Sequence, residues 1–191
     1  NEDTQELIDI LDRFQVKATF FVVGDWVDKY PESVKALHDA GHEVMNHSNS
    51  HAHMSQLSSE AIVADVEACN DKIEAVTGVR PTLIRPPYGE YDNNVITSIR
   101  SIGMEPIQWD VDSLDWKNYG VEEMTRQVVE NKNLDNGAII LMHNGTLYTA
   151  QALQGIIDGL ENKGYQFVPV SELILRDGYV INHEGKQMAG E

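Results

Sequence analysis

The chain has 191 residues, 41% of them hydrophobic and 24% charged, which are ordinary values for one soluble globular domain with a proper core. There are 31 Asp and Glu residues against 14 Lys and Arg residues, so the net charge is −17. Binding to a phosphate backbone relies on clustered Lys and Arg, and the sequence has no such cluster, which excludes nucleic acid as a partner. The single cysteine, Cys69, excludes an internal disulfide, and no apolar run reaches transmembrane length.

Apolar periodicity predicts alternating helices and strands along the chain. Residues 4–14 place apolar side chains on one helical face, and residues 17–24 form the continuous apolar run of a strand that is buried on both faces. Further helices are predicted at 31–41, 59–77, 92–102, 121–131 and 149–163, with a short one from 171. Further strands are predicted at 43–46, 82–85, 105–111, 138–143 and 166–170.

This strand–helix alternation with short connections predicts a parallel α/β sheet, either open or closed into a barrel. Polar residues of interest follow several different strands around the whole chain, which favours a distorted (β/α)7-type barrel. Because the chain opens on a helix, we expect its first strand to be missing, and we expect that N-terminal segment to associate with this chain. Residues 1–178 form the predicted domain, and residues 179–191 are read as a polar C-terminal extension.

Two histidines, His47 and His51, follow the predicted strand at 43–46. A spacing of four lets both rings point to one spot, and imidazole nitrogen is a preferred ligand of zinc and its neighbours. The alternative is a histidine-rich surface loop without a metal. His53 belongs to the same stretch and is interpreted as a residue at the rim of the site.

The segment from Arg85 to Tyr88 contains two consecutive prolines after the predicted strand at 82–85. Prolines fix an extended backbone, which would present the Arg85 guanidinium and the Tyr88 amide rigidly. A fixed guanidinium can hold a carboxylate, and a fixed N–H can stabilise an oxyanion. A plain Pro-Pro loop with a surface arginine is the alternative.

Three carboxylates, at Asp110, Asp112 and Asp115, lie near two tryptophans, so at least one acid is expected to be shielded from water. Such an acid should pair with a cation or orient a histidine, although Asp112 could simply cap a turn. His143 ends the next apolar run, where a lone histidine is more often a satisfied core residue than a catalyst. Leu141 lies two residues before it, on the same strand face.

Together these residues indicate metal-assisted hydrolysis. A metal lowers the pKa of a bound water toward about 7 and polarises a carbonyl. A base takes the proton of the water, a fixed amide holds the oxyanion and a histidine protonates the leaving group.

The same motifs resemble those of the polysaccharide deacetylases with a NodB homology domain, carbohydrate esterase family four, along nearly the whole chain. His47 to His51 resembles the family's His-(Ser/Thr)-x-x-His motif, and Arg85 to Tyr88 resembles Arg-x-Pro-Tyr. Asp115-Trp116 resembles the Asp-Trp motif, and Leu141 to His143 resembles Leu-x-His. The resemblance to bacterial peptidoglycan and sporulation deacetylases is the closest.

The resemblance implies a role for each matching residue. His47 and His51 would ligate a divalent metal, most simply zinc, with cobalt or nickel as alternatives. Arg85 would pair with the catalytic base, the Tyr88 N–H would stabilise the oxyanion, and His143 would be the general acid, oriented by Asp115. The substrate-binding residues would be Leu141, Trp116 and Pro87, with Leu141 and Trp116 lining the pocket for the acetyl methyl.

One family motif lies outside this chain. The resemblance implies aspartates on a strand before the first helix, which would supply the third protein ligand and the catalytic base. Catalytic zinc normally has three protein ligands. We therefore expect the intact protein to be an enzyme and the 191 residues alone to be impaired, and the alternative is a carbohydrate-binding relic without a base.

The substrate implied first is the N-acetylglucosamine of peptidoglycan, and chitin oligomers or acetylxylan are alternatives. A deacetylase of this kind would work outside a bacterial cell or at its surface.

Overall fold

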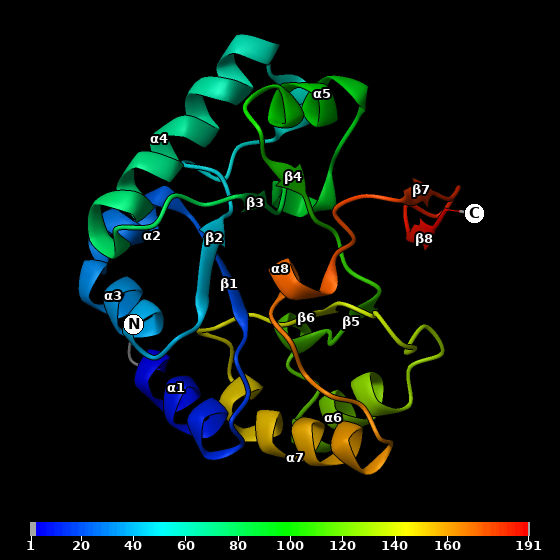
Figure 1. Ribbon diagram of the computed structural model, residues 1–191. Helices are drawn as coiled ribbons and strands as arrows, with labels where there is room; N and C mark the ends of the chain where they lie inside the picture. Colours follow the sequence, from blue (N-terminus) through cyan, green and yellow to red (C-terminus); the bar gives the residue numbers. More distant parts are fainter. Residues whose placement is uncertain (1–2, 191) are drawn as a thin grey trace.

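Parallel strands surrounded by helices form the body of the molecule (Figure 1). The computed structural model describes residues 3–190. The helices are α1 (Thr4–Arg13), α2 (Gly24–Lys29), α3 (Pro31–Asp39), α4 (Ser59–Thr77), α5 (Asn93–Ser101), α6 (Val121–Val129), α7 (Thr149–Asn162) and α8 (Val170–Leu173). The strands are β1 (Thr19–Val22), β2 (Glu43–Asn46), β3 (Leu83–Ile84), β4 (Glu105–Pro106), β5 (Val111–Asp112), β6 (Ile140–Leu141), β7 (Tyr179–Ile181) and β8 (Gln187–Ala189). Three 3-10 turns are η1 (Met54–Gln56), η2 (Pro87–Gly89) and η3 (Asp115–Lys117).

The strands of the body form two parallel sheets. β1, β2, β3 and β4 are neighbours in that order, with Val22 opposite Asn46 and Asn46 opposite Ile84. β5 and β6 pair separately, with Val111 opposite Ile140. Within residues 3–190 no ladder joins β1 to β6 or β4 to β5, so backbone hydrogen bonds do not close the ring of strands. The predicted parallel α/β class is confirmed.

Two of the predicted strands differ from the structure. The stretch predicted at 105–111 contains two short strands with an irregular link between them. The strand predicted at 166–170 is wrong, because residues 165–169 are irregular and α8 begins at Val170. The N–H of Val170 donates to the Thr19 hydroxyl at 2.9 Å, so a side chain replaces the strand partner there. The six-residue helix α2 was not predicted.

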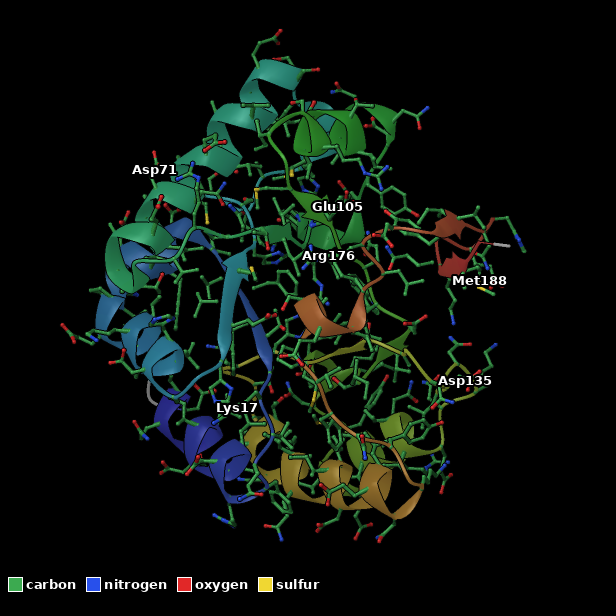
Figure 2. All side chains as sticks on the ribbon, in the orientation of Figure 1. Lys17, Asp71, Glu105, Asp135, Arg176 and Met188 are labelled. Atoms are coloured by element: carbon green, nitrogen blue, oxygen red, sulfur yellow. The ribbon has the colours of Figure 1, made fainter. Side chains whose placement is uncertain are left out.

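The C-terminal extension is an antiparallel hairpin of β7 and β8, not a featureless polar tail. Lys186 anchors it to the body through an ion pair with Asp110 at 2.9 Å. Met188 lies on the outer side of this hairpin, at the edge of the molecule (Figure 2). Val180, Ile181 and Met188 are exposed, so the extension also presents apolar side chains to solvent.

Helix α4 is the longest helix and has clear boundary signals. The Ser58 hydroxyl caps its first turn by accepting from the Ala61 N–H, and Gly78 ends it at φ +75°, a conformation that a side chain disfavours. Cys69 lies on its buried face, and burial raises the pKa of this thiol to about 12. The outer face carries an ion-pair network of Arg80 with three acids, including Asp71 (Figure 2).

A cavity of about 500 Å³ lies between β1 and β6, the facing edges of the two sheets. Its inner wall is apolar and includes Leu7 and Leu11 of α1 and Leu153 of α7. These side chains belong to one core cluster, which joins the two sheets through their helices. Among the described residues, no helix is long and apolar enough to cross a membrane.

His42 provides a test of how burial affects stability. Its ring is buried, its Nδ1 accepts from the Ala18 N–H at 3.2 Å, and it packs edge-on against Phe20. Burial and the nearby Lys17 charge lower the pKa of His42, so the folded state holds fewer protons than the unfolded state as pH falls through about 6.5. The free energy of unfolding should therefore decrease as pH is lowered from 7 to 5.5.

Urea unfolding across this pH range checks the prediction, and His42→Gln, which cannot titrate, should weaken the pH dependence. His38→Gln serves as the matched control, because His38, on α3, is less buried than His42. If the free energy of unfolding of the His42→Gln variant depends on pH as steeply as that of the parent, the prediction is contradicted.

Candidate active site

Residues from the carboxyl ends of β2, β3 and β6 meet at the cavity between the two sheets. His47 and His51 follow β2, Arg85 and Tyr88 follow β3, and His143 follows β6, and all five line this cavity. Parallel strands bring their carboxyl ends to the same side, which is where α/β proteins build their sites. The structure therefore brings together five residues that the sequence singled out.

The His47 ring is fixed by a hydrogen bond between its Nδ1 and the carbonyl of Arg85, at 2.6 Å. A carbonyl only accepts, so Nδ1 carries the proton and Nε2 keeps its lone pair. Burial lowers the pKa of His47 to about 4, which keeps the ring neutral. The His51 ring stands edge-on to it at 4.9 Å between centroids, and burial also lowers its pKa.

The loop that carries both histidines is held from several sides. Ser48 and His51 have φ of +71° and +57°, so each sits in a conformation that L residues rarely adopt. The Gly24 N–H donates to the Ser48 carbonyl, and a Cβ on Gly24 would clash with Asn49. Asp65 of α4 accepts from the Asn49 N–H at 2.8 Å. The contributions of Gly24 and Asp65 were missed, since nothing local in the sequence marks them.

These two rings are suited to a metal because both are neutral and one has its tautomer set by a hydrogen bond. They account for two ligands only. Residues 3–190 contain no group of three or more His, Cys, Asp or Glu side chains that could hold an ion. A complete catalytic zinc site therefore needs one more ligand than these residues provide.

Arg85 is a buried cation with no carboxylate partner in the described part of the chain. Its guanidinium lies over the Phe21 ring at 4.5 Å and near Trp109 at 5.6 Å, and its Nη2 donates to the Gln108 carbonyl. The buried Nε has no acceptor among residues 3–190. Burial lowers the pKa of Arg85 to about 10, so the group stays charged at neutral pH. A buried guanidinium without a carboxylate partner would be stabilised by an anion that binds next to it.

Tyr88 sits in the left-handed region, with φ of +60°, and its exposed ring contacts two histidines. The His53 ring is stacked on the Tyr88 ring at 4.1 Å with 6° between the planes, and the His51 ring meets it edge-on at 4.6 Å. Glu90 holds His53 at 3.0 Å. His53, which was expected at the rim, therefore supports the residue whose amide the sequence singled out.

Asp115 and His143 form a hydrogen-bonded pair across the second sheet. Asp115 is 2% exposed, and its Oδ1 lies 2.8 Å from the His143 Nδ1. Its Oδ2 accepts from the His143 N–H at 2.5 Å and from the Thr149 hydroxyl at 2.8 Å. Burial alone would raise the pKa of Asp115, but these hydrogen bonds lower it. The same bond to Asp115 raises the pKa of His143. Thr149 was not predicted.

The other acids of this stretch have structural partners. Asp112 accepts from the Leu114 N–H at 2.9 Å, as a turn cap, and Asp110 accepts from the Ile139 N–H. The expectation that one shielded acid would orient a histidine is met by Asp115 alone.

The residues expected to bind substrate lie in three different settings. Leu141 is buried and lines the cavity beside His143. Pro87 is buried in η2 and does not line this cavity, whereas its neighbour Pro86 does. Trp116 is 56% exposed and also lies outside the cavity lining. Only Leu141 is therefore placed as the wall of a pocket next to the two histidines.

Comparison with known proteins agrees with this arrangement. The family model described as polysaccharide deacetylase matches residues 1–107. The chain belongs to the polysaccharide deacetylase family. It is 36% identical over 170 residues to the peptidoglycan-N-acetylglucosamine deacetylase PgdA of Listeria monocytogenes, and 36% identical over 170 residues to the peptidoglycan-N-acetylmuramic acid deacetylase PdaC of Bacillus subtilis. Each match covers 89% of this chain and 35% of the relative. The chain thus spans about a third of the length of these relatives.

Solved structures share the fold. A Bacillus anthracis protein described as a CE4 family pseudoenzyme superimposes with a TM-score of 0.86 at 35% identity, over 90% of this chain and 60% of that one. The predicted distorted parallel α/β barrel is therefore confirmed as the fold, with the break in strand pairing noted above. Relatives of this family include both deacetylases and a pseudoenzyme.

Replacing Asp115 by Asn should lower the pKa of His143, because the carboxylate that stabilises the imidazolium is removed. The pKa is measured by NMR titration of the ring, so the test does not depend on activity. Asp112→Asn is the matched control, since the Asp112 charge contributes less to this pKa, and its shift should be smaller. An equal shift in both variants would argue against the pair as the dominant cause.

Proposed function

We propose that this protein is a metal-dependent deacetylase that removes acetyl groups from N-acetylglucosamine in peptidoglycan, outside a bacterial cell or at its surface. The observation that carries the proposal is the placement of His143, paired with the buried Asp115, beside the two neutral imidazoles at one cavity. Chitin oligomers and acetylxylan remain alternative substrates. The names of both peptidoglycan deacetylases above support peptidoglycan as the substrate, and the name of the Listeria relative supports N-acetylglucosamine within it.

The residues divide the chemistry among them. His47 and His51 would hold the metal, with zinc as the first choice and cobalt or nickel as alternatives. When bound, such an ion supplies an activated water and polarises the acetyl carbonyl. His143, whose pKa is raised, holds the proton that the leaving amine needs, and Asp115 keeps the ring oriented.

The amide and the walls of the cavity position the acetyl group. The Tyr88 N–H, held in a strained backbone conformation, would donate to the oxyanion. Leu141 would contact the acetyl methyl, while Pro87 fixes the loop that presents Tyr88. Trp116, exposed beside Asp115, would contact the sugar outside the cavity.

The third metal ligand and the base would be carboxylates on a strand that enters the gap between β1 and β6. The apolar wall of the gap suits the buried face of a strand, and Arg85 at its mouth suits an acid. Such a strand would complete both the sheet and the site.

Zinc binding tests the metal ligands without relying on turnover. His47→Ala and His51→Ala should each weaken zinc binding by at least about tenfold, because each removes a direct ligand. A competition titration against a chromogenic chelator measures the affinity. His183→Ala, in the exposed turn between β7 and β8, is the matched control and should bind as the parent does. Parent-like affinity in the His47 variant would refute its role.

Acetate release tests the function itself. The intact protein should release acetate from peptidoglycan and from N-acetylglucosamine oligomers, and a chelator should abolish the release until zinc is restored. The 191-residue chain alone should be much slower, because residues 3–190 place no carboxylate in an ion pair with Arg85. Activity that survives complete metal removal would refute the mechanism.

A glycan-binding protein without hydrolysis is the second candidate. The two-ligand set and the unpaired Arg85 favour it, and so does the structural match to a pseudoenzyme. Glycan binding by the intact protein with zinc present, but with no acetate release from any substrate, would support this candidate instead.

A further inference from the structure

Lys117, the last residue of η3, lies close to two exposed aromatic side chains, Trp116 of the same turn and Tyr119 just after it. Its ammonium lies 5.1 Å from the centroid of the Trp116 ring and 5.7 Å from that of Tyr119. The two rings are 56% and 60% exposed. Large aromatic side chains that lie close together and are exposed to solvent indicate a binding surface.

This cluster, consisting of Trp116, Lys117 and Tyr119, is fixed next to the Asp115–His143 pair. Lys117 is two residues after Asp115, so the two Cα atoms are at most about 7.6 Å apart. Asp115 itself is buried and tied to β6 and α7 by three hydrogen bonds. The hydrogen bonds of Asp115 therefore hold the backbone of the cluster in a fixed position at the edge of the proposed site.

The charge of Lys117 is available to a ligand. No carboxylate within 4.0 Å of its ammonium is found among residues 3–190, and its contacts are the two rings. Many other cations of this acidic chain are neutralised, as in the pairs Lys35–Asp39 and Lys72–Asp28. An exposed cation whose neighbours are aromatic rings is suited to a ligand that has both an anionic group and an apolar face. The anionic group would pair with the cation, and the apolar face would pack on the rings.

We propose that Trp116, Lys117 and Tyr119 form a subsite for a sugar that carries a carboxylate, within an N-acetylated glycan. The C–H face of the sugar ring would pack on the aromatic rings, while the ammonium pairs with the carboxylate. N-acetylmuramic acid has such a group wherever its lactyl carboxyl carries no peptide, and the sugars of chitin have none. The inference rests on the proposed function and deepens it, because it selects an anionic cell-wall glycan over a neutral one.

Binding measured in the presence of a chelator tests the subsite apart from hydrolysis. The ligands are a tetramer of N-acetylglucosamine and a tetramer that alternates N-acetylglucosamine with N-acetylmuramic acid, titrated by calorimetry. The intact protein should bind the carboxylate-bearing tetramer about three- to fivefold more tightly, as expected for one solvent-exposed ion pair. High salt should reduce this preference.

Two variants and a control locate the effect. Lys117→Gln should remove the preference, with the larger loss of affinity for the carboxylate-bearing tetramer, and Lys117→Arg should retain it. Lys29→Gln is the matched control, because Lys29 also lies 5.1 Å from the centroid of an aromatic ring, Tyr30, but on α2. It should leave the preference intact.

Equal affinity of the parent protein for the two tetramers, absence of binding to either, or a preference that survives Lys117→Gln would each overturn the subsite. Failure of acetate release with the binding preference intact would instead refute only the hydrolytic function.

Discussion

A buried carboxylate can remain ionised only where hydrogen-bond donors replace the water that it has lost. Asp115 meets this condition through the ring and the N–H of His143 and the hydroxyl of Thr149. These donors come from the end of β6 and the start of α7, whereas Asp115 itself follows β5. One side chain therefore fixes the relative positions of three elements and, through them, the orientation of the His143 ring.

The candidate site is divided between the two sheets. The metal-binding loop and the Arg85–Tyr88 segment belong to the four-stranded sheet, and the Asp115–His143 pair belongs to the two-stranded one. Since no ladder joins these sheets across the cavity in the described residues, their spacing depends on packing. Leu7 and Leu11 of α1 pack with Leu153 and Ile157 of α7 beneath the cavity. The apolar core under the site thus sets the distance between its two halves.

The sequence predicted the fold and the candidate site wherever local signals agreed with long-range contacts. α4 was predicted with the observed boundaries, which the structure shows to be marked by Ser58 and Gly78. His143 was expected to meet an acid because both residues follow neighbouring strands. The strand at 166–170 failed because its apolar pattern suits either a strand or an irregular packed segment. Asp65 and Thr149 could not be identified, since their roles depend on contacts across the fold.

The hydrogen bond from His47 to the Arg85 carbonyl joins two loops that the sequence presents as separate motifs. A shift of either loop relative to the other lengthens this bond. A movement of the Arg85–Tyr88 backbone as a ligand enters would therefore rotate the imidazole of His47. The prolines stiffen the Arg85–Tyr88 loop, and the hydrogen bond extends this restraint to the loop of His47. A substitution at Pro86 would therefore change the orientation of the His47 ring, 39 positions earlier in the chain.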